Sequence, residues 1–96
     1  MIKEICGKMI NVKSLLLESS DLLNVKMVLT TEDRKTFSVL FSGVSSFEIK
    51  DVSFPFEISA LEVIDNTVRG YQADKRFFVN DYEDGRLSFY CEKITM

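Results

Sequence analysis

The sequence contains no histidine and no tryptophan, and only one proline, four glycines and two cysteines. Without histidine, it lacks the usual general base near neutral pH, the Ser-His and Cys-His nucleophile pairs and the commonest zinc ligand. The four glycines are too widely spaced for a phosphate-binding loop, and no serine lies in a GxSxG motif. We therefore expect a protein that is not an enzyme and that holds no metal ion and no cofactor.

Long apolar runs are also missing. The longest apolar stretches, SLLLE and VLFSGV, have the length of a strand and are too short to cross a membrane. The N-terminal segment carries Glu4 and lacks the continuous apolar run of a signal peptide. These features predict a cytoplasmic protein with no membrane partner.

The two cysteines lie near opposite ends of the chain. Cys6 and Cys91 form no CxxC pair, so their spacing indicates neither a metal site nor a redox motif. Two reduced cysteines, buried as small apolar side chains, fit a cytoplasmic protein. A disulfide that joins the two terminal segments is the alternative.

The charge balance is acidic, with 12 lysines and arginines against 15 aspartates and glutamates and a formal net charge of −3. The basic residues are scattered, and their two short clusters, at 33–35 and 74–76, each contain an acid. Nucleic-acid binding requires cations gathered on one face. We therefore expect no nucleic-acid partner, and a basic protein partner would suit this charge better.

What the sequence does have is an apolar pattern of period two. Residues 23–29 alternate Leu23, Val25, Met27 and Leu29 with other side chains, and the same period recurs over 37–42 and 46–50. This pattern is typical of antiparallel strands with one face buried. Polar turns at 18–21 and 32–35 join the first three such segments, which predicts a meander.

The second half is less regular. Pro55 marks a connection or a sheet edge, because proline cannot donate to a strand ladder. Residues 57–65 favour a strand over a helix because of their β-branched residues and short length. We expect a single domain over 1–96, an antiparallel β-sandwich or open barrel of six or seven strands. A helix, if present at all, is confined to residues 1–8.

The sharpest local pattern is YEDGR at 82–86, between two apolar segments. Glu83-Asp84-Gly85 predicts a three-residue hairpin loop with Gly85 in the left-handed conformation. A two-residue loop, Asp84-Gly85, would set apolar residues against polar ones and fits worse. The preferred register pairs, in order outward from the loop, Tyr82 with Arg86, Asn80 with Ser88, Val79 with Phe89, Phe78 with Tyr90, Phe77 with Cys91, and Arg76 with Glu92.

Turn chemistry accounts for the acidic residues of this hairpin. We expect the carboxylates of Asp81, Glu83 and Asp84 to point into water, where they would form neither a calcium site nor a catalytic pair.

The same register sends aromatic side chains away from the core. Phe78, Tyr90 and Tyr82 would lie on the outer face of the hairpin. Another strand, the 66–75 segment or a second protomer could cover them. Alternatively they form a partner-binding patch ringed by acids. On that interpretation the binding residues are Phe78, Tyr82, Tyr90, Asp81, Glu83, Asp84 and Glu92.

The C-terminal part resembles a group of small, uncharacterised bacterial β proteins that end in F-x-V-x-D-Y-E-x-x-x-(L/I)-x-F-x-C. The matching positions are Phe77, Val79, Asp81, Tyr82, Glu83, Leu87, Phe89 and Cys91. The chain departs from the group at Tyr71, where a tryptophan is expected after the glycine. Such proteins are similar in size and acidity to immunity proteins of polymorphic-toxin systems. The resemblance concerns core and turn positions, so it implies a fold more than a site.

Together these observations favour a non-catalytic protein-binding domain. The resemblance implies immunity to a cognate toxin, and the acidic charge suggests that the partner is a basic toxin domain. Two alternatives stay open. One is a structural subunit that forms homo-oligomers through a sheet edge or the aromatic face. The other is a β-barrel that binds a small molecule, which would require an internal cavity.

Overall fold

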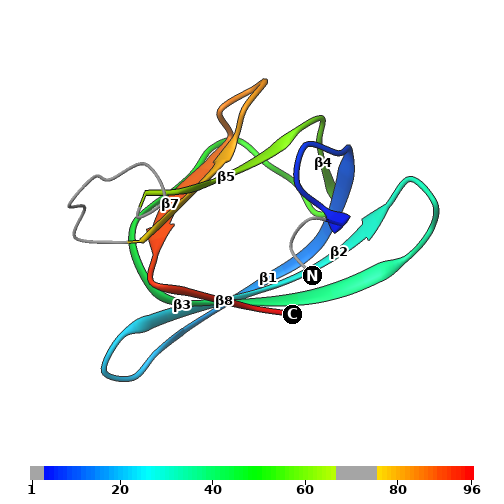
Figure 1. The fold of residues 1–96 in the computed structure, drawn as a ribbon. Coiled ribbons are helices and arrows are strands. Elements are labelled where there is room, and N and C mark those ends of the chain that lie inside the picture. Colours follow the sequence, from blue (N-terminus) through cyan, green and yellow to red (C-terminus); the bar gives the residue numbers. More distant parts are fainter. Residues whose placement is uncertain (1–3, 67–75) are drawn as a thin grey trace.

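The computed structural model describes residues 4–66 and 76–96, and it is built from β-strands (Figure 1). The strands are β1 (Ile10–Ser19), β2 (Leu23–Thr31), β3 (Thr36–Ile49), β4 (Phe56–Ile58), β5 (Leu61–Asp65), β6 (Phe77–Asp81), β7 (Leu87–Cys91) and β8 (Lys93–Thr95). No helix in the described ranges is long and apolar enough to cross a membrane. Where the sequence allowed a short N-terminal helix, Glu4 has 3₁₀-helical geometry and residues 5–8 form a turn and a bend, with no α-helix.

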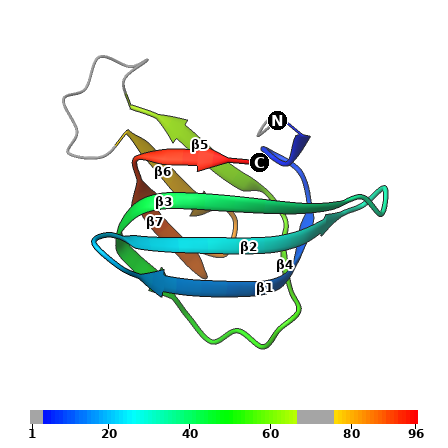
Figure 2. The same cartoon turned by 90° about the horizontal axis from the view of Figure 1, so that it is seen from below.

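The strands form one antiparallel sheet in the order β4-β1-β2-β3-β7-β6-β5, and β8 pairs with β3 outside this path. Strands β1, β2 and β3 make one wall, β5, β6 and β7 make the wall opposite, and the long β3 bends from one to the other (Figures 1 and 2). This confirms the predicted class, a mostly β, antiparallel β-sandwich or open barrel.

Strand β3 is a single element of 14 residues where the sequence suggested two strands. Gly43 and Ser46 both have positive φ, 66° and 52°, and the pairing of β3 with β7 shifts between Ser45 and Glu48. Such irregularities bend a strand without ending it. The strand therefore pairs with β2 along its first half and with β7 along its second.

The segment 56–65 shows the opposite difference, since it is split where one strand was expected. β4 pairs with β1, whereas β5 pairs with β6 on the opposite wall. Only Ser59 and Ala60 separate the two strands, so the chain bends there and passes from one wall to the other. With β8, these changes give eight strands instead of six or seven.

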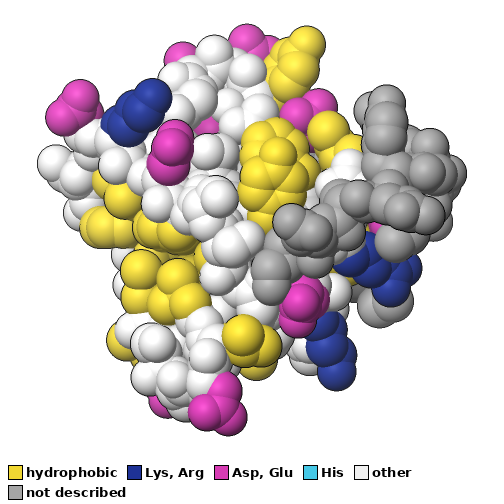
Figure 3. All heavy atoms as spheres, turned by 90° about the vertical axis from the view of Figure 1, so that its left-hand side faces the viewer, with side chains coloured by type: hydrophobic (Ala, Val, Ile, Leu, Met, Phe, Trp, Pro, Cys, Tyr) yellow, Lys and Arg dark blue, Asp and Glu magenta, His cyan; other side chains and the backbone are white. Residues whose placement is uncertain are grey.

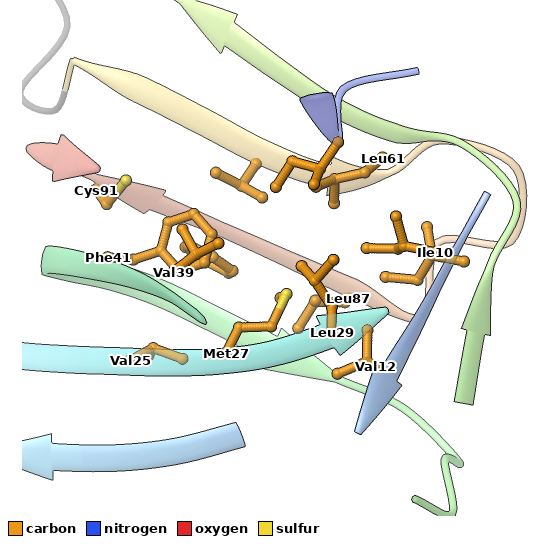
Figure 4. Packing of buried hydrophobic residues seen from close by; sticks show 14 of the residues in the cluster. Ile10, Val12, Val25, Met27, Leu29, Val39, Phe41, Leu61, Leu87 and Cys91 are labelled. Carbon is orange, nitrogen blue, oxygen red and sulfur yellow. The ribbon is translucent and has the colours of Figure 1, made fainter. Parts of the chain in front are cut away.

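The interior is filled by the inward-facing side chains of both walls (Figure 4). Phe41 from β3 and Phe89 from β7 meet edge to face, with ring centroids 4.9 Å apart. Val25, Met27 and Leu29 are fully buried, as the alternation predicted. Close packing of this kind leaves the two walls as one rigid core.

The β6–β7 hairpin has the predicted register. The pairs Phe77–Cys91, Phe78–Tyr90, Val79–Phe89 and Asn80–Ser88 are all formed. Gly85 has φ 63°, as expected. The loop is wider than predicted, because the Gly85 amide donates to the Asp81 carbonyl at 2.9 Å and the Tyr82 amide donates to Ala60 of the neighbouring segment at 3.1 Å.

Both cysteines are free thiols in the structure. Cys91 is buried in the core, and Cys6 is half-buried, so the expectation of two buried cysteines holds for Cys91 alone. Burial raises the pKa of the Cys6 thiol above its usual value.

Gly85→Val should lower the free energy of unfolding by about 1–2 kcal/mol, because a β-branched residue is strained at positive φ. No atom lies within 4 Å of the position that a Cβ would take, so backbone strain is the only cost. Urea denaturation measures the effect. Gly85→Asn is the control and should lose less, because asparagine tolerates this conformation. Equal stability of wild type and Gly85→Val would contradict the turn.

Thiol titration should find two reactive groups in denaturant without reductant. In the folded protein at neutral pH, Cys6 should react slowly because its raised pKa leaves little thiolate, and Cys91 should be protected by the core. Finding no reactive thiol after denaturation would show that the cysteines are joined.

Candidate functional site

An apolar stripe crosses the outer face of the β5–β6–β7 wall. Ile64 pairs with Phe78, and Phe78 pairs with Tyr90, so the three side chains follow one another across three strands. We call this set, Ile64, Phe78 and Tyr90, the aromatic stripe. Figure 3 views the molecule from the side on which β7 lies in Figure 1 and shows hydrophobic side chains gathered there among acidic ones.

The two rings of the stripe contact each other. Their centroids lie 4.8 Å apart with planes tilted by 41°. Tyr90 keeps 38% of its surface exposed, whereas Phe78 and Ile64 are half-buried. Aromatic pairs at this distance contribute about 0.5–1.5 kcal/mol beyond their burial, so the rings hold each other in place. Because β6 is paired on both sides, the stripe has a fixed backbone beneath it.

A polar row runs beside the stripe. Glu62 pairs with Asn80, Asn80 with Ser88, and Ser88 with Glu48, so a carboxylate lies at each end. The Asn80 amide donates to the Glu62 carboxylate at 3.5 Å. No local sequence pattern singles out Glu48 or Glu62, because their place beside the stripe depends on pairings between distant strands. Cross-strand neighbours of this kind lie about 5 Å apart.

Glu92, one of the predicted binding residues, follows β7 two positions after Tyr90. Its amide donates to the Ser42 carbonyl at 2.9 Å, and its side chain is exposed. A Cβ on Gly43 would lie 2.7 Å from the Glu92 carboxylate, so Gly43 leaves the space that this side chain occupies. The Glu92 carboxylate therefore lies beside Gly43 of β3, two residues along the chain from Tyr90.

Tyr82 does not belong to the stripe. It lies four residues beyond Phe78, about 13 Å along the chain direction, and is 65% exposed. Its ring lines a separate surface hollow of about 460 Å³, together with Cys6, Gly7, Ala60, Leu61, Glu62 and Val63. The sequence correctly predicted that Tyr82 is exposed, but the structure separates it from Phe78 and Tyr90.

The expectation that Asp81 points into water is wrong. Asp81 is fully buried and faces inward opposite Leu61. Its carboxylate accepts hydrogen bonds from the Asp84 amide at 3.4 Å and the Arg86 amide at 3.2 Å. Asp81 is thus a capping group for the hairpin loop and is not available to a partner.

Arg86 balances this buried charge. Its Nε lies 3.7 Å from the Asp81 carboxylate, although no hydrogen bond is formed there. Its Nη2 donates to the Glu57 carbonyl in β4, and its guanidinium lies over the Phe56 ring at 5.6 Å. Asp81 and Arg86 therefore join the loop to β4.

The two remaining acids of the loop are exposed, as predicted. Asp84 lies 3.5 Å from Arg86 Nη2, so part of its charge is balanced. Glu83 is at the tip, with its side chain in solvent. Both lie beyond the end of β6, so they contribute to the electrostatic field around the aromatic stripe without contacting its side chains.

Another group of polar residues gathers at the turn between β2 and β3. The Thr31 hydroxyl donates to the Asp33 carboxylate, and this hydrogen bond lowers the pKa of Asp33. Lys35 lies 3.7 Å from the same carboxylate. These contacts are those of a closed polar turn. Across residues 4–66 and 76–96, no group of three or more histidine, cysteine or acidic side chains could hold a metal ion.

No family model, curated protein or solved structure matches this chain. The geometry is therefore the basis for any functional inference. It offers a rigid apolar stripe between carboxylates, which is suited to contact with another protein.

Asp81→Ala should lower the free energy of unfolding by about 2–3 kcal/mol, because it leaves two loop amides and the Arg86 charge without their acceptor. Chemical denaturation measures the loss. Asp84→Ala is the matched control. Its side chain is 53% exposed, so the loss should stay below about 1 kcal/mol. Equal effects of the two substitutions would show that Asp81 does not hold the loop.

Proposed function

We propose that this chain is a non-catalytic protein-binding domain that contacts its partner through the aromatic stripe. The observation that carries the proposal is the Phe78–Tyr90 pair, which faces outward on a doubly paired strand with Tyr90 partly exposed. Tyrosine and phenylalanine are enriched at the centres of protein interfaces, since their rings bury a large area with little loss of side-chain freedom.

The charges around the stripe favour a basic partner. The polar row that ends in Glu48 and Glu62 runs along one side of the stripe, and Glu92 lies on the other side of the stripe. The chain as a whole carries a net charge of −3. Complementary charge at the rim of an interface mainly speeds association, whereas an apolar centre slows dissociation.

Immunity to a toxin is the specific form of this proposal. It rests on the resemblance of the C-terminal part to small uncharacterised bacterial β proteins, which are similar in size and acidity to immunity proteins. An acidic surface would suit the inhibition of a basic toxin domain. Eight positions carry the resemblance: Phe77, Val79, Asp81, Tyr82, Glu83, Leu87, Phe89 and Cys91. Of these, only Tyr82 and Glu83 are exposed, so most of the pattern describes the core.

Binding of a small molecule inside the barrel is a weaker candidate. Phe41, Phe89 and Met27 fill the space between the two walls. Two hollows on the described part of the chain, at the β2–β3 turn and beside Tyr82, lie on the outer surface. A small-molecule site would need enclosed apolar space, which these side chains occupy.

Tyr90→Ala should speed dissociation from the partner and weaken binding by about 2 kcal/mol, because it removes the most exposed ring of the stripe. A Glu48→Gln/Glu62→Gln pair should instead slow association and reduce its salt dependence. Surface plasmon resonance at two salt concentrations separates the two effects. The first proteins to test are those encoded next to the gene of this chain, basic toxin domains above all.

Phe54→Ala is the matched control, since Phe54 is an exposed aromatic residue on the β3–β4 connection, outside the stripe. It should bind as wild type does. If a partner is found and Tyr90→Ala also binds as wild type, the stripe is not the interface. If co-expression with each neighbouring toxin domain restores no growth, the immunity form of the proposal is wrong.

A further inference from the structure

Strand β1 has an open edge. Along one side it pairs with β2 over its whole length, from Ile10 to Ser19. Along the other side it pairs with β4 only at Ile10, Asn11 and Val12. Among the described residues, no backbone hydrogen bond joins residues 13–19 to any segment other than β2. Figure 2 shows β1 at the margin of its wall.

Over residues 14–18 this edge lacks the features that usually block strand pairing, because Lys13 and the register shift both lie at its start. Exposed edges are commonly protected by proline, by an inward-pointing charge, by a central lysine or by a bulge. Here the only irregularity lies between Val12 and Ser14, where the pairing with β4 ends. Residues 14–18 read Ser-Leu-Leu-Leu-Glu, a regular and largely apolar strand.

The leucines of this strand are exposed. Leu16 is 58% exposed on the outer face, and Leu17 is also exposed. Leu15 and Leu17 lie opposite Met27 and Val25, so they extend the inward face of the barrel beyond its closed part. An exposed apolar strand with free backbone groups is suited to pairing with another strand.

We propose that a second copy of this chain pairs with residues 13–19 of β1, antiparallel and related by a two-fold axis at Leu16. Residues that lie directly opposite each other in antiparallel strands have their side chains on the same face of the sheet. Because side chains alternate between faces along each copy, the numbers of two opposed residues must add to an even value. Centring on Leu16 sets Leu16 against Leu16, Leu15 against Leu17 and Ser14 against Glu18. Centring on Leu15 or Leu17 sets leucine against serine, lysine or glutamate.

Charge is compatible with the same register. Lys13 of one copy lies across from Ser19 of the other, and Glu18 lies across from Ser14. The register therefore matches leucine with leucine and sets no like charges directly opposite each other. This self-complementarity favours a second copy over an unrelated extended peptide. The surface buried is small, so the dimer should form in a concentration-dependent way.

The inference goes beyond the proposed function, because it uses the wall opposite the aromatic stripe. Sedimentation velocity of the full chain over a range of concentrations tests it. The wild type should shift from monomer to dimer as concentration rises. Leu16→Lys should stay monomeric at every concentration, because it sets two lysines against each other at the axis.

Leu40→Lys is the matched control. Leu40 is an exposed leucine on the same outer face, but it lies on β3 between β2 and β8, away from the edge. It should dimerise as wild type does. Circular dichroism and thermal melting check that both variants fold. A wild type that stays monomeric throughout, or a Leu16→Lys variant that still dimerises, would overturn the proposal.

A cross-link tests the register itself. Directly opposed residues of antiparallel strands have Cα atoms about 4.5–5.5 Å apart, which suits a disulfide. Leu16→Cys in a Cys6→Ala background should therefore oxidise to a covalent dimer, with Cys91 protected in the core. Leu40→Cys in the same background should not. Equal cross-linking of both variants would rule out the register centred on Leu16.

Discussion

The buried carboxylate of Asp81 organises the end of the molecule where four segments meet. It holds the loop between β6 and β7 through the amides of Asp84 and Arg86. The same loop donates from the Tyr82 amide to Ala60 before β5, and the Arg86 carbonyl accepts from the Lys50 amide after β3. Arg86 reaches the Glu57 carbonyl in β4. One turn thus ties three other segments together.

These contacts of the β6–β7 loop determine how far the barrel closes. The sheet begins at β4 and ends at β5, and these are the two halves of the segment 56–65. Arg86 holds β4 near the hairpin loop, so β4 runs alongside β1 for only three residues before it leaves. Closure near Asp81 and the open edge of β1 are therefore two consequences of one arrangement. Burial of a charge is costly, which favours a turn where backbone amides and an arginine satisfy it.

The sequence predicted the parts of the fold that depend on local pattern. Alternation identified the inward residues of β2 and β3, and the Gly85 turn set the register of the last hairpin. The same alternation contained the signal for Asp81, which shares a face with Phe77 and Val79. Turn chemistry alone was a sufficient explanation for an acid at that position, so its burial was missed.

The features that the sequence did not predict depend on contacts between distant segments. The bend of β3 at Gly43 and Ser46 arises because the strand pairs with β2 in one wall and with β7 in the other. A local pattern of period two continues through such a bend and does not mark it. Likewise, Glu48 and Glu62 reach the aromatic stripe only through the pairing of β7 with β3 and of β6 with β5. The sequence could identify residues near the stripe that lie within the β6–β7 hairpin, but not those that other strands bring next to it.

The two proposed surfaces rely on different physics and lie on opposite walls. The aromatic stripe offers side chains on a strand whose backbone groups are already paired, so its specificity comes from ring contacts and rim charge. The β1 edge offers backbone groups, so its specificity comes from register. Because neither surface uses the residues of the other, both can be occupied at once. A dimer through β1 would then carry two aromatic stripes, and a partner with two matching sites would bind with a higher effective concentration than the single contact provides.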